Sequence, residues 1–380
     1  MRFTLSSSAL NARLQSLAKV INSKNSLPIL DSFLFEVSNS GLKITASDNE
    51  NVMTSLVPLS ECDGEGSFAV PNRTILDAVK ELPEQPLQFE VDIEALTIKI
   101  LYQNGMYNFT AQNADEYPHT QAVPDGAHVI TMASNSLVNN ITRSLFATAT
   151  DELRPVMNGI YFDLTTDYLA IVATDGHKLV RNQDYTVKSD TPASFILPKK
   201  PATLLKNVLS KDDSDVVIKF DDRTTEIRFA EGQLCCRLIE GNYPNYNSVI
   251  PENPHNMSID RKSLIGALRR VLPFASESSQ LVRFRIESGK LEVSSEDIDF
   301  ATSAKEQIVC DYNGPQMSIG FKGSSLQEIL NNLDCDEVNF QLADPSRAGV
   351  IVPTEQPENV NVHTMLKTYF FVDKICFIPL

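Results

Sequence analysis

An amphipathic segment recurs three times along the chain at intervals of 127 residues. In the first copy, the apolar residues on one face of a helix with 3.6 residues per turn are Leu10, Leu14, Leu17 and Ile21. The corresponding residues of the later copies are Leu137, Ile141 and Leu145, and then Leu264, Leu268, Val271 and Leu272. A segment repeated at this interval predicts three like domains, which we place at residues 1–124, 125–251 and 252–380.

Each predicted domain contains two helices separated by short strands. The expected helices span residues 7–24, 72–82, 132–147, 198–211, 260–272 and 322–333. The predicted order in each domain is strand, helix, three strands, helix and three strands, with turn residues such as Ser38–Gly41 between strands. Short strands joined by tight turns are typical of antiparallel sheets. The sequence therefore predicts an α+β fold with two helices per domain packed on antiparallel sheets.

Composition disfavours several classes of protein. No apolar run approaches the roughly 20 residues of a membrane-spanning helix. The N-terminal Met1–Leu5 is strand-like rather than a signal sequence, so a cytoplasmic protein is expected. The six cysteines include no C-x-x-C pair, and only five histidines are present. These residues favour buried reduced thiols over a zinc site or a disulfide framework, and we expect no metal and no cofactor.

The net charge of −16 is distributed unevenly along the chain. The six predicted helices cover 84 residues with a net charge of +11, so the other 296 residues carry −27. Basic helices on one side of acidic sheets attract a polyanion on that side only. No aromatic residues alternate with the basic ones, and no zinc-finger or RNA-binding signature is present, which favours sequence-independent contact with duplex phosphates. The competing interpretation is ordinary surface charge that keeps exposed helices soluble.

Two other functions, an enzyme and a protein-binding scaffold, remain open on the sequence. Asp175 and His177 are candidates for acid–base catalysis, but no second histidine, nucleophile or metal cluster accompanies them. Taken alone, Thr174–Leu179 is more typical of an Asp-Gly turn that ends a strand. The other alternative is an acidic repeat scaffold that binds only proteins.

Several short motifs resemble those of a known family. They are Leu27–Leu30, Val172–Leu179, Gly241–Tyr246, Asn158-Gly159 and Ile319–Phe321. The chain resembles the bacterial sliding clamps, the β subunits of the replicative DNA polymerase, from Met1 to about Val352. The resemblance implies a ring-forming DNA-clamp fold, a head-to-tail homodimer around duplex DNA, and no catalytic activity. It also implies a hydrophobic pocket between the second and third domains that binds short peptides of the replicative polymerase, the clamp loader and repair proteins.

The resemblance assigns roles to individual positions. Lys24, Arg73, Lys199 and Lys200 match residues that face DNA, and the helix charges add Arg143 and Lys206. The implied dimer interface brings Tyr107 and Phe109 of one chain against Leu272 and Phe274 of the other. The implied peptide pocket contains Arg154, Met157, Thr174, Gly176, His177, Lys178, Leu179, Pro244, Val249 and Ser346.

The chain departs from the family pattern in two places. Ser248 stands where the family often has an arginine at the pocket wall. Family members usually end in a short Met-Pro-rich strand that completes the pocket, and by spacing Met365-Leu366 takes that place. The chain then continues through Lys367–Leu380, which is either a second candidate for the pocket wall, an independent strand or a disordered end.

Overall fold

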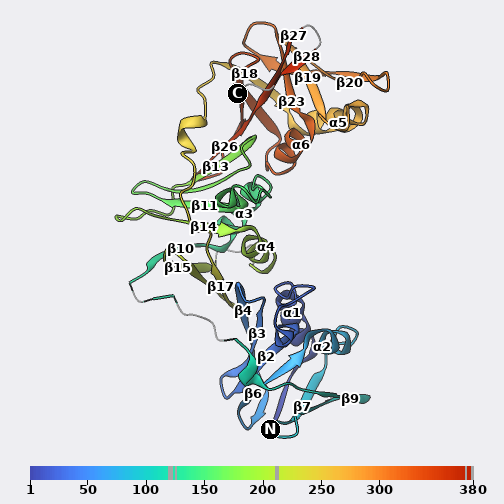
Figure 1. The fold of residues 1–380 in the computed structure, drawn as a ribbon, viewed down its shortest axis with the longest axis vertical. Coiled ribbons are helices and arrows are strands. Elements are labelled where there is room, and N and C mark those ends of the chain that lie inside the picture. The colour runs from blue at the N-terminus through green and yellow to red at the C-terminus, as the bar shows by residue number, and fades with distance from the viewer. Residues whose placement is uncertain (119–122, 125, 210–213, 373–374, 378–380) are drawn as a thin grey trace. The chain divides into compact units, whose positions relative to one another are not determined.

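The computed structural model describes residues 1–118, 123–124, 126–209, 214–372 and 375–377. The chain divides into two compact units (Figure 1). One consists of Met1–Val138 with Lys200–Leu238, and the other of Asn139–Lys199 with Ile239–Leu380. Part of the predicted linker before residue 126 and the end of the C-terminal tail lie outside the described residues. The exact bounds of the three domains stay a prediction.

All six predicted helices are present, although each is shorter than expected. They are α1 (Ser7–Leu17), α2 (Asn72–Val79), α3 (Ser134–Leu145), α4 (Lys199–Val208), α5 (Arg261–Val271) and α6 (Gly323–Asn331). Ser6 caps α1 by accepting a hydrogen bond from the Ala9 amide at 3.1 Å. The expectation that Ile21 belongs to this helix is wrong. After Ala18, the backbone changes to bonds between residues three apart, such as Val20 N to Leu17 O at 3.0 Å, and the helix ends.

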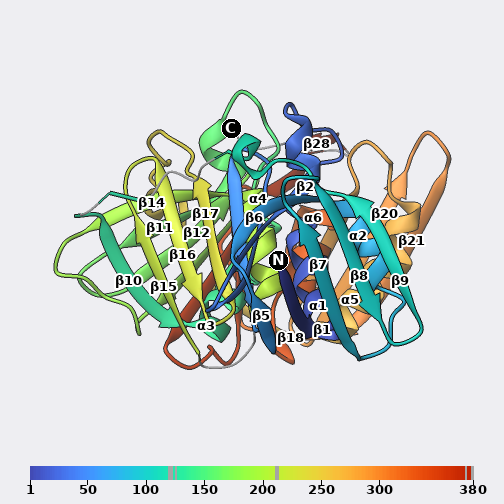
Figure 2. The same cartoon turned by 90° about the horizontal axis from the view of Figure 1, so that it is seen from below.

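The first unit contains two antiparallel sheets. One runs β5 (Glu61–Asp63), β1 (Arg2–Ser6), β7 (Pro86–Asp92), β8 (Thr97–Tyr102) and β9 (Gly105–Thr110). The other runs β10 (His128–Ala133), β15 (Asp215–Phe220), β16 (Thr224–Phe229), β17 (Gly232–Arg237), β4 (Asn51–Val57), β3 (Gly41–Ser47), β2 (Ser32–Ser38) and β6 (Gly66–Pro71). Figure 2 shows β7, β8 and β9 side by side, with β9 outermost of the three.

The second unit also contains two antiparallel sheets. One runs β14 (Ala193–Pro198), β11 (Gly159–Leu164), β12 (Leu169–Thr174), β13 (Lys178–Asp184), β26 (Val360–Leu366), β25 (Gly349–Pro353), β24 (Glu337–Leu342), β18 (His255–Asp260) and β22 (Asp311–Tyr312). The other runs β21 (Thr302–Val309), β20 (Lys290–Asp297), β19 (Leu281–Glu287), β23 (Met317–Lys322), β27 (Thr368–Val372) and β28 (Ile375–Phe377).

The predicted order lacks one strand in each domain, in addition to the short β5 and β22. In each domain a fourth strand, β6, β14 or β23, comes directly before the second helix. Each of them contains three consecutive buried residues, for example Phe68–Val70 in β6. A short buried run of this kind lacks the alternation that marks a strand in sequence. With it, each domain becomes two copies of one strand, one helix and three strands.

Strand pairs join neighbouring domains within each unit. Met53 of β4 pairs with Leu234 of β17, so one sheet contains strands of the first and second domains. Val180 of β13 pairs with Thr364 of β26, which joins the second and third domains in the same way. β4 and β13 are each the third strand after the first helix of their domain. Each pairs with the third strand after the second helix of the next domain, β17 or β26, which we call the last main strand of that domain.

The helices bury their apolar faces, as their periodicity predicts. Leu10, Leu14 and Leu17 of α1 are fully buried, and so are Leu264 and Leu268 of α5. Each such side chain contributes about 1.5–3 kcal/mol through removal from water. The predicted α+β fold of three domains, with helices on antiparallel sheets, is confirmed.

Candidate functional site

The turn between β12 and β13 is held in one conformation by its own side chains. Thr174 Oγ1 donates to Lys178 O at 2.8 Å and accepts from Gly176 N at 3.1 Å. Asp175 Oδ1 accepts from the amides of His177 and Lys178, both at 2.8 Å. Gly176 has a φ of +86°, which a residue without a Cβ adopts at little cost. The turn therefore presents its residues in a fixed arrangement at the junction of the second and third domains.

Lys178 links this turn to the third domain. Its ammonium lies 2.9 Å from Asp175 Oδ2 and 3.2 Å from a carboxylate oxygen of Glu328 in α6, and its side chain is only 10% exposed. Burial by itself raises the pKa of Asp175 and lowers that of Lys178. The hydrogen bond and the charge interaction between them outweigh burial, so the pKa of Asp175 is lowered and that of Lys178 is raised. Both directions indicate a charged pair at neutral pH.

An apolar cluster lies beside the turn. Leu179 of β13 pairs with Met365 of β26, and both belong to a buried cluster that also contains Ala170, Val172 and Tyr246. The segment after β17 packs against this cluster. The ring of Tyr243 stacks on Tyr161, with centroids 4.5 Å apart and planes at 4°, and Tyr246 donates to Asp163 Oδ2 at 2.7 Å.

Sequence reasoning assigned no site role to Tyr161, Tyr243 or Tyr246. Tyr243 and Tyr246 lay within the quoted Gly241–Tyr246 motif, which was the available signal. Met365 was placed near the pocket by spacing, and the structure now pairs it directly with Leu179.

The other predicted pocket residues lie in the same compact unit. Arg154 and Met157 lie at a short 3₁₀ helix, η3 (Pro155–Asn158). Arg154 Nε donates to Asp151 at 2.9 Å, and its guanidinium lies so close to Gly176 that a Cβ there would be 2.8 Å from Nη1. Pro244, Val249 and Ser346 are exposed at the surface, and their role in a pocket stays a prediction.

The segment after β26 continues as a strand beside this site. Lys367 N donates to His177 O at 2.9 Å, and Thr368 Oγ1 donates to Arg347 O at 3.2 Å, next to Ser346. β27 then pairs with β23 and turns back into β28. Met365-Leu366 therefore lies on the strand beside the apolar cluster, and the beginning of the tail ties the turn at His177 to the turn at Arg347. Residues 373–374 and 378–380 lie outside the described part.

His363 of β26 lies opposite Arg181 of β13, with Nδ1 2.9 Å from the Arg181 guanidinium. Burial, and then the positive charge of Arg181, lower the pKa of His363 to about 4. The unfolded chain gains this proton below about pH 6.5, whereas the folded chain does not until about pH 4. We therefore expect the free energy of unfolding to fall as the pH drops through this window.

Urea unfolding across this pH range tests the effect. His363→Gln is expected to flatten the decline between about pH 6.5 and pH 4, because the residue that titrates is removed. His177→Gln, the same substitution at an exposed histidine, serves as the control. Identical slopes for all three proteins would contradict the assignment.

The predicted DNA-facing cations fall into two groups. Lys24, Arg73, Lys199 and Lys206 have exposed side chains. Arg143 is largely buried, which lowers its pKa, and it interacts with Asp334 and Asp184. Lys200 is bound within the protein, because its ammonium donates to Val20 O at 2.6 Å, to Asn22 Oδ1 at 2.7 Å and to the carboxylate of Asp48.

The predicted dimer residues lie at two terminal strands. Tyr107 and Phe109 belong to β9, the last strand of the five-stranded sheet. Leu272 and Phe274 form η5 (Leu272–Phe274), which packs near β21, the last strand of the six-stranded sheet. Phe274 is 40% exposed.

Searches for other kinds of site gave negative results in the described part of the chain. No group of three or more His, Cys, Asp and Glu residues there is arranged to hold a metal ion. The thiols of Cys62, Cys235, Cys236, Cys310 and Cys335 are free. Among the described helices, none has both the length and the apolar character to cross a membrane.

Three repeated domains, sheets that continue from one domain into the next, and an apolar cluster at one joint define a protein of the DNA-clamp class. Family models for the N-terminal, central and C-terminal domains of the DNA polymerase III beta subunit match residues 1–121, 131–245 and 247–367. The chain belongs to this family, the sliding clamps, as its motifs predicted.

Curated relatives and solved structures agree with this assignment. The beta sliding clamp of Pseudomonas aeruginosa is 27% identical over 366 residues, which are 95% of this chain and 98% of that protein. The beta sliding clamp of Bacillus subtilis is 26% identical over 97% of this chain and 100% of its own length. The crystal structure of the P. aeruginosa clamp bound to griselimycin has a TM-score of 0.90 at 25% identity and covers 96% and 99% of the two chains.

The family assignment also settles the enzymatic alternative. The chain is a non-catalytic polymerase subunit, and the hypothesis of acid–base catalysis by Asp175 and His177 is wrong. The structure gives Asp175 another task, because its carboxylate holds the turn and pairs with Lys178.

Proposed function

We propose that two copies of this chain close head to tail into a ring around duplex DNA and that the ring tethers partner proteins to the DNA. The observation that supports closure is the pattern of strand pairing. β4 and β13 each pair with the last main strand of the following domain. Their counterpart in the third domain, β21, is a terminal strand, and so is β9 of the first domain. Pairing β21 with β9 of a second chain repeats the same joint and closes the ring.

A ring of this kind holds DNA by topology rather than by affinity. The exposed cations Lys24, Arg73, Lys199 and Lys206 supply weak, salt-sensitive contacts with phosphates and no base contacts, so the ring slides. Arg143 and Lys200 have acidic neighbours within the protein, and we assign them a smaller share of DNA contact. A cytoplasmic location follows from this function.

Retention on DNA tests the ring. Protein loaded onto a nicked circular plasmid is expected to remain with the plasmid through gel filtration and to be lost after one restriction cut, because only a free end releases a closed ring. A protein-only scaffold is not retained on either DNA. Equal retention on circular and linear DNA would contradict encirclement and point to ordinary phosphate binding.

We further propose that the cluster at Leu179 and Met365 is the floor of a pocket for short peptides. Its apolar floor gives affinity, and the rigid turn Thr174–Lys178 with Arg154 beside it fixes the register of an extended segment. The expected partners are the replicative polymerase, the clamp loader and repair proteins. We keep Pro244, Val249 and Ser346 at its rim.

Met157→Ala combined with His177→Ala is expected to weaken binding of a labelled clamp-binding peptide from the replicative polymerase by about tenfold, because both residues belong to the proposed pocket. Fluorescence anisotropy measures the affinity, and sedimentation checks that the dimer is intact. Val129→Ala, at an exposed position on β10 in the other unit, is the control. Unchanged affinity in the double variant would overturn the pocket assignment.

A further inference from the structure

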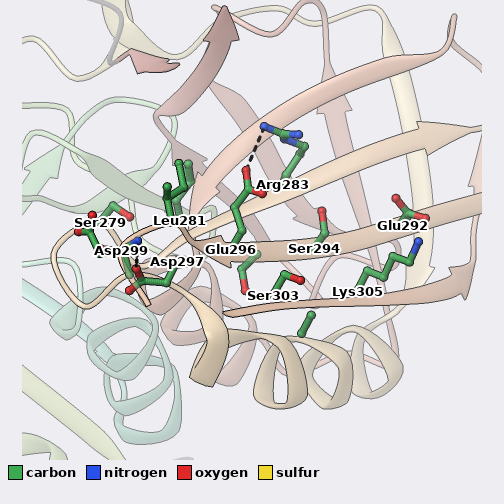
Figure 3. Close-up of a pocket in the computed structure, with 14 residues that line it drawn as sticks. Ser279, Leu281, Arg283, Glu292, Ser294, Glu296, Asp297, Asp299, Ser303 and Lys305 are labelled. Atoms are coloured by element: carbon green, nitrogen blue, oxygen red, sulfur yellow. Dashed lines mark hydrogen bonds and ion pairs between the residues drawn. The ribbon is translucent and has the colours of Figure 1, made fainter. Parts of the chain in front are cut away.

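A second groove lies on the outer face of the third domain, outside the site described above. It has a volume of about 800 Å³ and is formed by strands β19, β20 and β21 with the turns before β19 and after β20, which lie at the same end of the sheet (Figure 3). Its lining residues are mostly polar. Those on the strands include Leu281, Arg283, Glu292, Ser294, Glu296 and Lys305, and Asp297 and Asp299 lie at one end.

Strand pairing identifies the same face in the other two domains. Core residues pair as Phe35 with Ile44, Phe162 with Ile171 and Phe284 with Val293. Because side chains alternate along a strand, the residues before Phe35, Phe162 and Phe284 occupy equivalent places on the outer face. These residues are Leu34, Tyr161 and Arg283.

In the first two domains this face is covered by the segment that follows the last main strand. Tyr117 is 3% exposed and packs with Leu34, and Tyr243 stacks on Tyr161. In the third domain the corresponding segment pairs with β23 as β27 and then turns back as β28. None of the described residues that line the groove comes from this segment. The third copy of a face that elsewhere holds a connecting segment is therefore open.

The chemistry of the open face differs from that of the covered ones. Tyr161, Ala170 and Val172 in the second domain correspond to Arg283, Glu292 and Ser294 in the third. An apolar segment does not suit this floor, because it would cover polar groups without pairing them. A segment that carries its own charges is needed.

The acidic side chains have capacity for a further partner. The lining contains four carboxylates, at Glu292, Glu296, Asp297 and Asp299, against two cations, at Arg283 and Lys305. Figure 3 shows Arg283 directed toward Glu296, and their closest charged atoms are 4.0 Å apart. Asp297 is committed to the turn, since it accepts from the amides of Asp299 and Phe300.

We propose that this groove is a docking site for an extended, basic segment of a partner protein. The segment lies across β19–β21 as the linkers lie across the equivalent faces, and its lysine or arginine side chains meet Glu292, Glu296 and Asp299. The site does not depend on ring closure, because all of its residues belong to one domain of one chain.

The probe is a fluorescein-labelled peptide of nine residues in which lysine alternates with glycine. We expect saturable binding by the full-length protein that weakens with salt, as exposed charge contacts do. Glu292→Gln with Glu296→Gln is expected to weaken this binding by about tenfold. The control is Glu355→Gln with Glu358→Gln, which changes the net charge equally at exposed positions outside the groove and leaves the affinity unchanged.

Three results would overturn the proposal. The first is no detectable binding of the lysine peptide. The second is equal weakening in the two double variants, which indicates attraction to the net charge of −16 rather than to the groove. The third is tighter binding of an aromatic peptide with the sequence of residues 241–247, unaffected by Glu292→Gln and Glu296→Gln, which indicates an apolar occupant.

Discussion

Ser303→Cys combined with Asn108→Cys is expected to give a ring that oxidation closes covalently at both joints. On a non-reducing denaturing gel the protein should run at about 84 kDa, twice the 42.2 kDa of one chain. Oxidised after loading, it should remain on circular DNA under conditions that dissociate the wild-type dimer. Oxidised before loading, it should fail to load, because the ring has no opening.

The register of this cross-link follows from the two joints inside the chain. Met53 pairs with Leu234, and Val180 pairs with Thr364. Ala304 is the counterpart of Met53 and Val180. Within the three domains the equivalent pairs are Met53 with Ala46, Val180 with Ala173, and Ala304 with Ser295. Tyr107, opposite Ile100, corresponds to Leu234, opposite Ile227.

A third joint of the same kind therefore places Ala304 opposite Tyr107 of the second chain, and Ser303 opposite Asn108. Directly opposed residues of antiparallel strands have Cα atoms about 4.5–5.5 Å apart, a separation that a disulfide spans. Lys305→Cys with Asn108→Cys is the matched control, displaced by two residues to a diagonal separation of about 7–8 Å. Equal cross-linking of both pairs, or of neither, would contradict the register.

The sequence predicted the elements of the fold better than their connections. The stripe of Leu10, Leu14 and Leu17 indicates a helix because its period is a local property, and those residues are fully buried. The pairing of Met53 with Leu234 is not local. β4 has an ordinary alternating pattern and β17 a short buried run, and nothing within either strand specifies which distant edge completes its backbone hydrogen bonds. The joints between domains therefore emerged only from the structure.

The same limit applies to charge. The sum of +11 over the predicted helices is correct as arithmetic, but it treats every cation as free. Arg13 pairs with Glu231, Arg270 with Glu306 and Lys200 with Asp48, in each case with an acid from outside its helix. A count along the chain cannot see these partners, so it overstates the charge that the helices offer to DNA.

The sequence identified some residues of the candidate site and missed others for a similar reason. Thr174–Leu179 was identified because one contiguous motif contains the turn and its hydrogen bonds. Met365 and Tyr161 come from distant segments that meet only after folding, and their residue types alone are those of any buried strand. A motif reveals site residues only when those residues are close in sequence. Most residues of the apolar cluster come from segments that are distant in sequence.

Lys200→Met is expected to lower the free energy of unfolding by about 3 kcal/mol, because it leaves a buried carboxylate without its cation. Asp48 is 4% exposed at its side chain, and its Oδ2 faces the Lys200 ammonium. The backbone amides of Glu50 and Asn51 bind the other oxygen at 3.0 Å and 2.7 Å, so part of the carboxylate stays satisfied. Oδ2 also accepts from the side-chain amide of Asn51 at 3.0 Å, so the substitution removes the cation from this oxygen without leaving it wholly unsatisfied.

Urea unfolding measures the change, with Lys206→Met as the control on the same helix. Lys206 is exposed, and its substitution should alter the free energy of unfolding by no more than about 0.5 kcal/mol. Asp48→Asn added to Lys200→Met should recover part of the loss, because it removes the unpaired charge.

The pair of variants also separates the two roles assigned to these lysines. If Lys200 serves mainly to hold the first and second domains together, Lys200→Met loses stability, and Lys206→Met weakens binding to a short linear duplex, on which a closed ring gives no retention. If Lys200 is instead a phosphate ligand, its substitution weakens binding to the linear duplex and leaves the unfolding free energy unchanged. That second result would contradict the structural role, because a cation bound by Val20, Asn22 and Asp48 has no donor left for a phosphate.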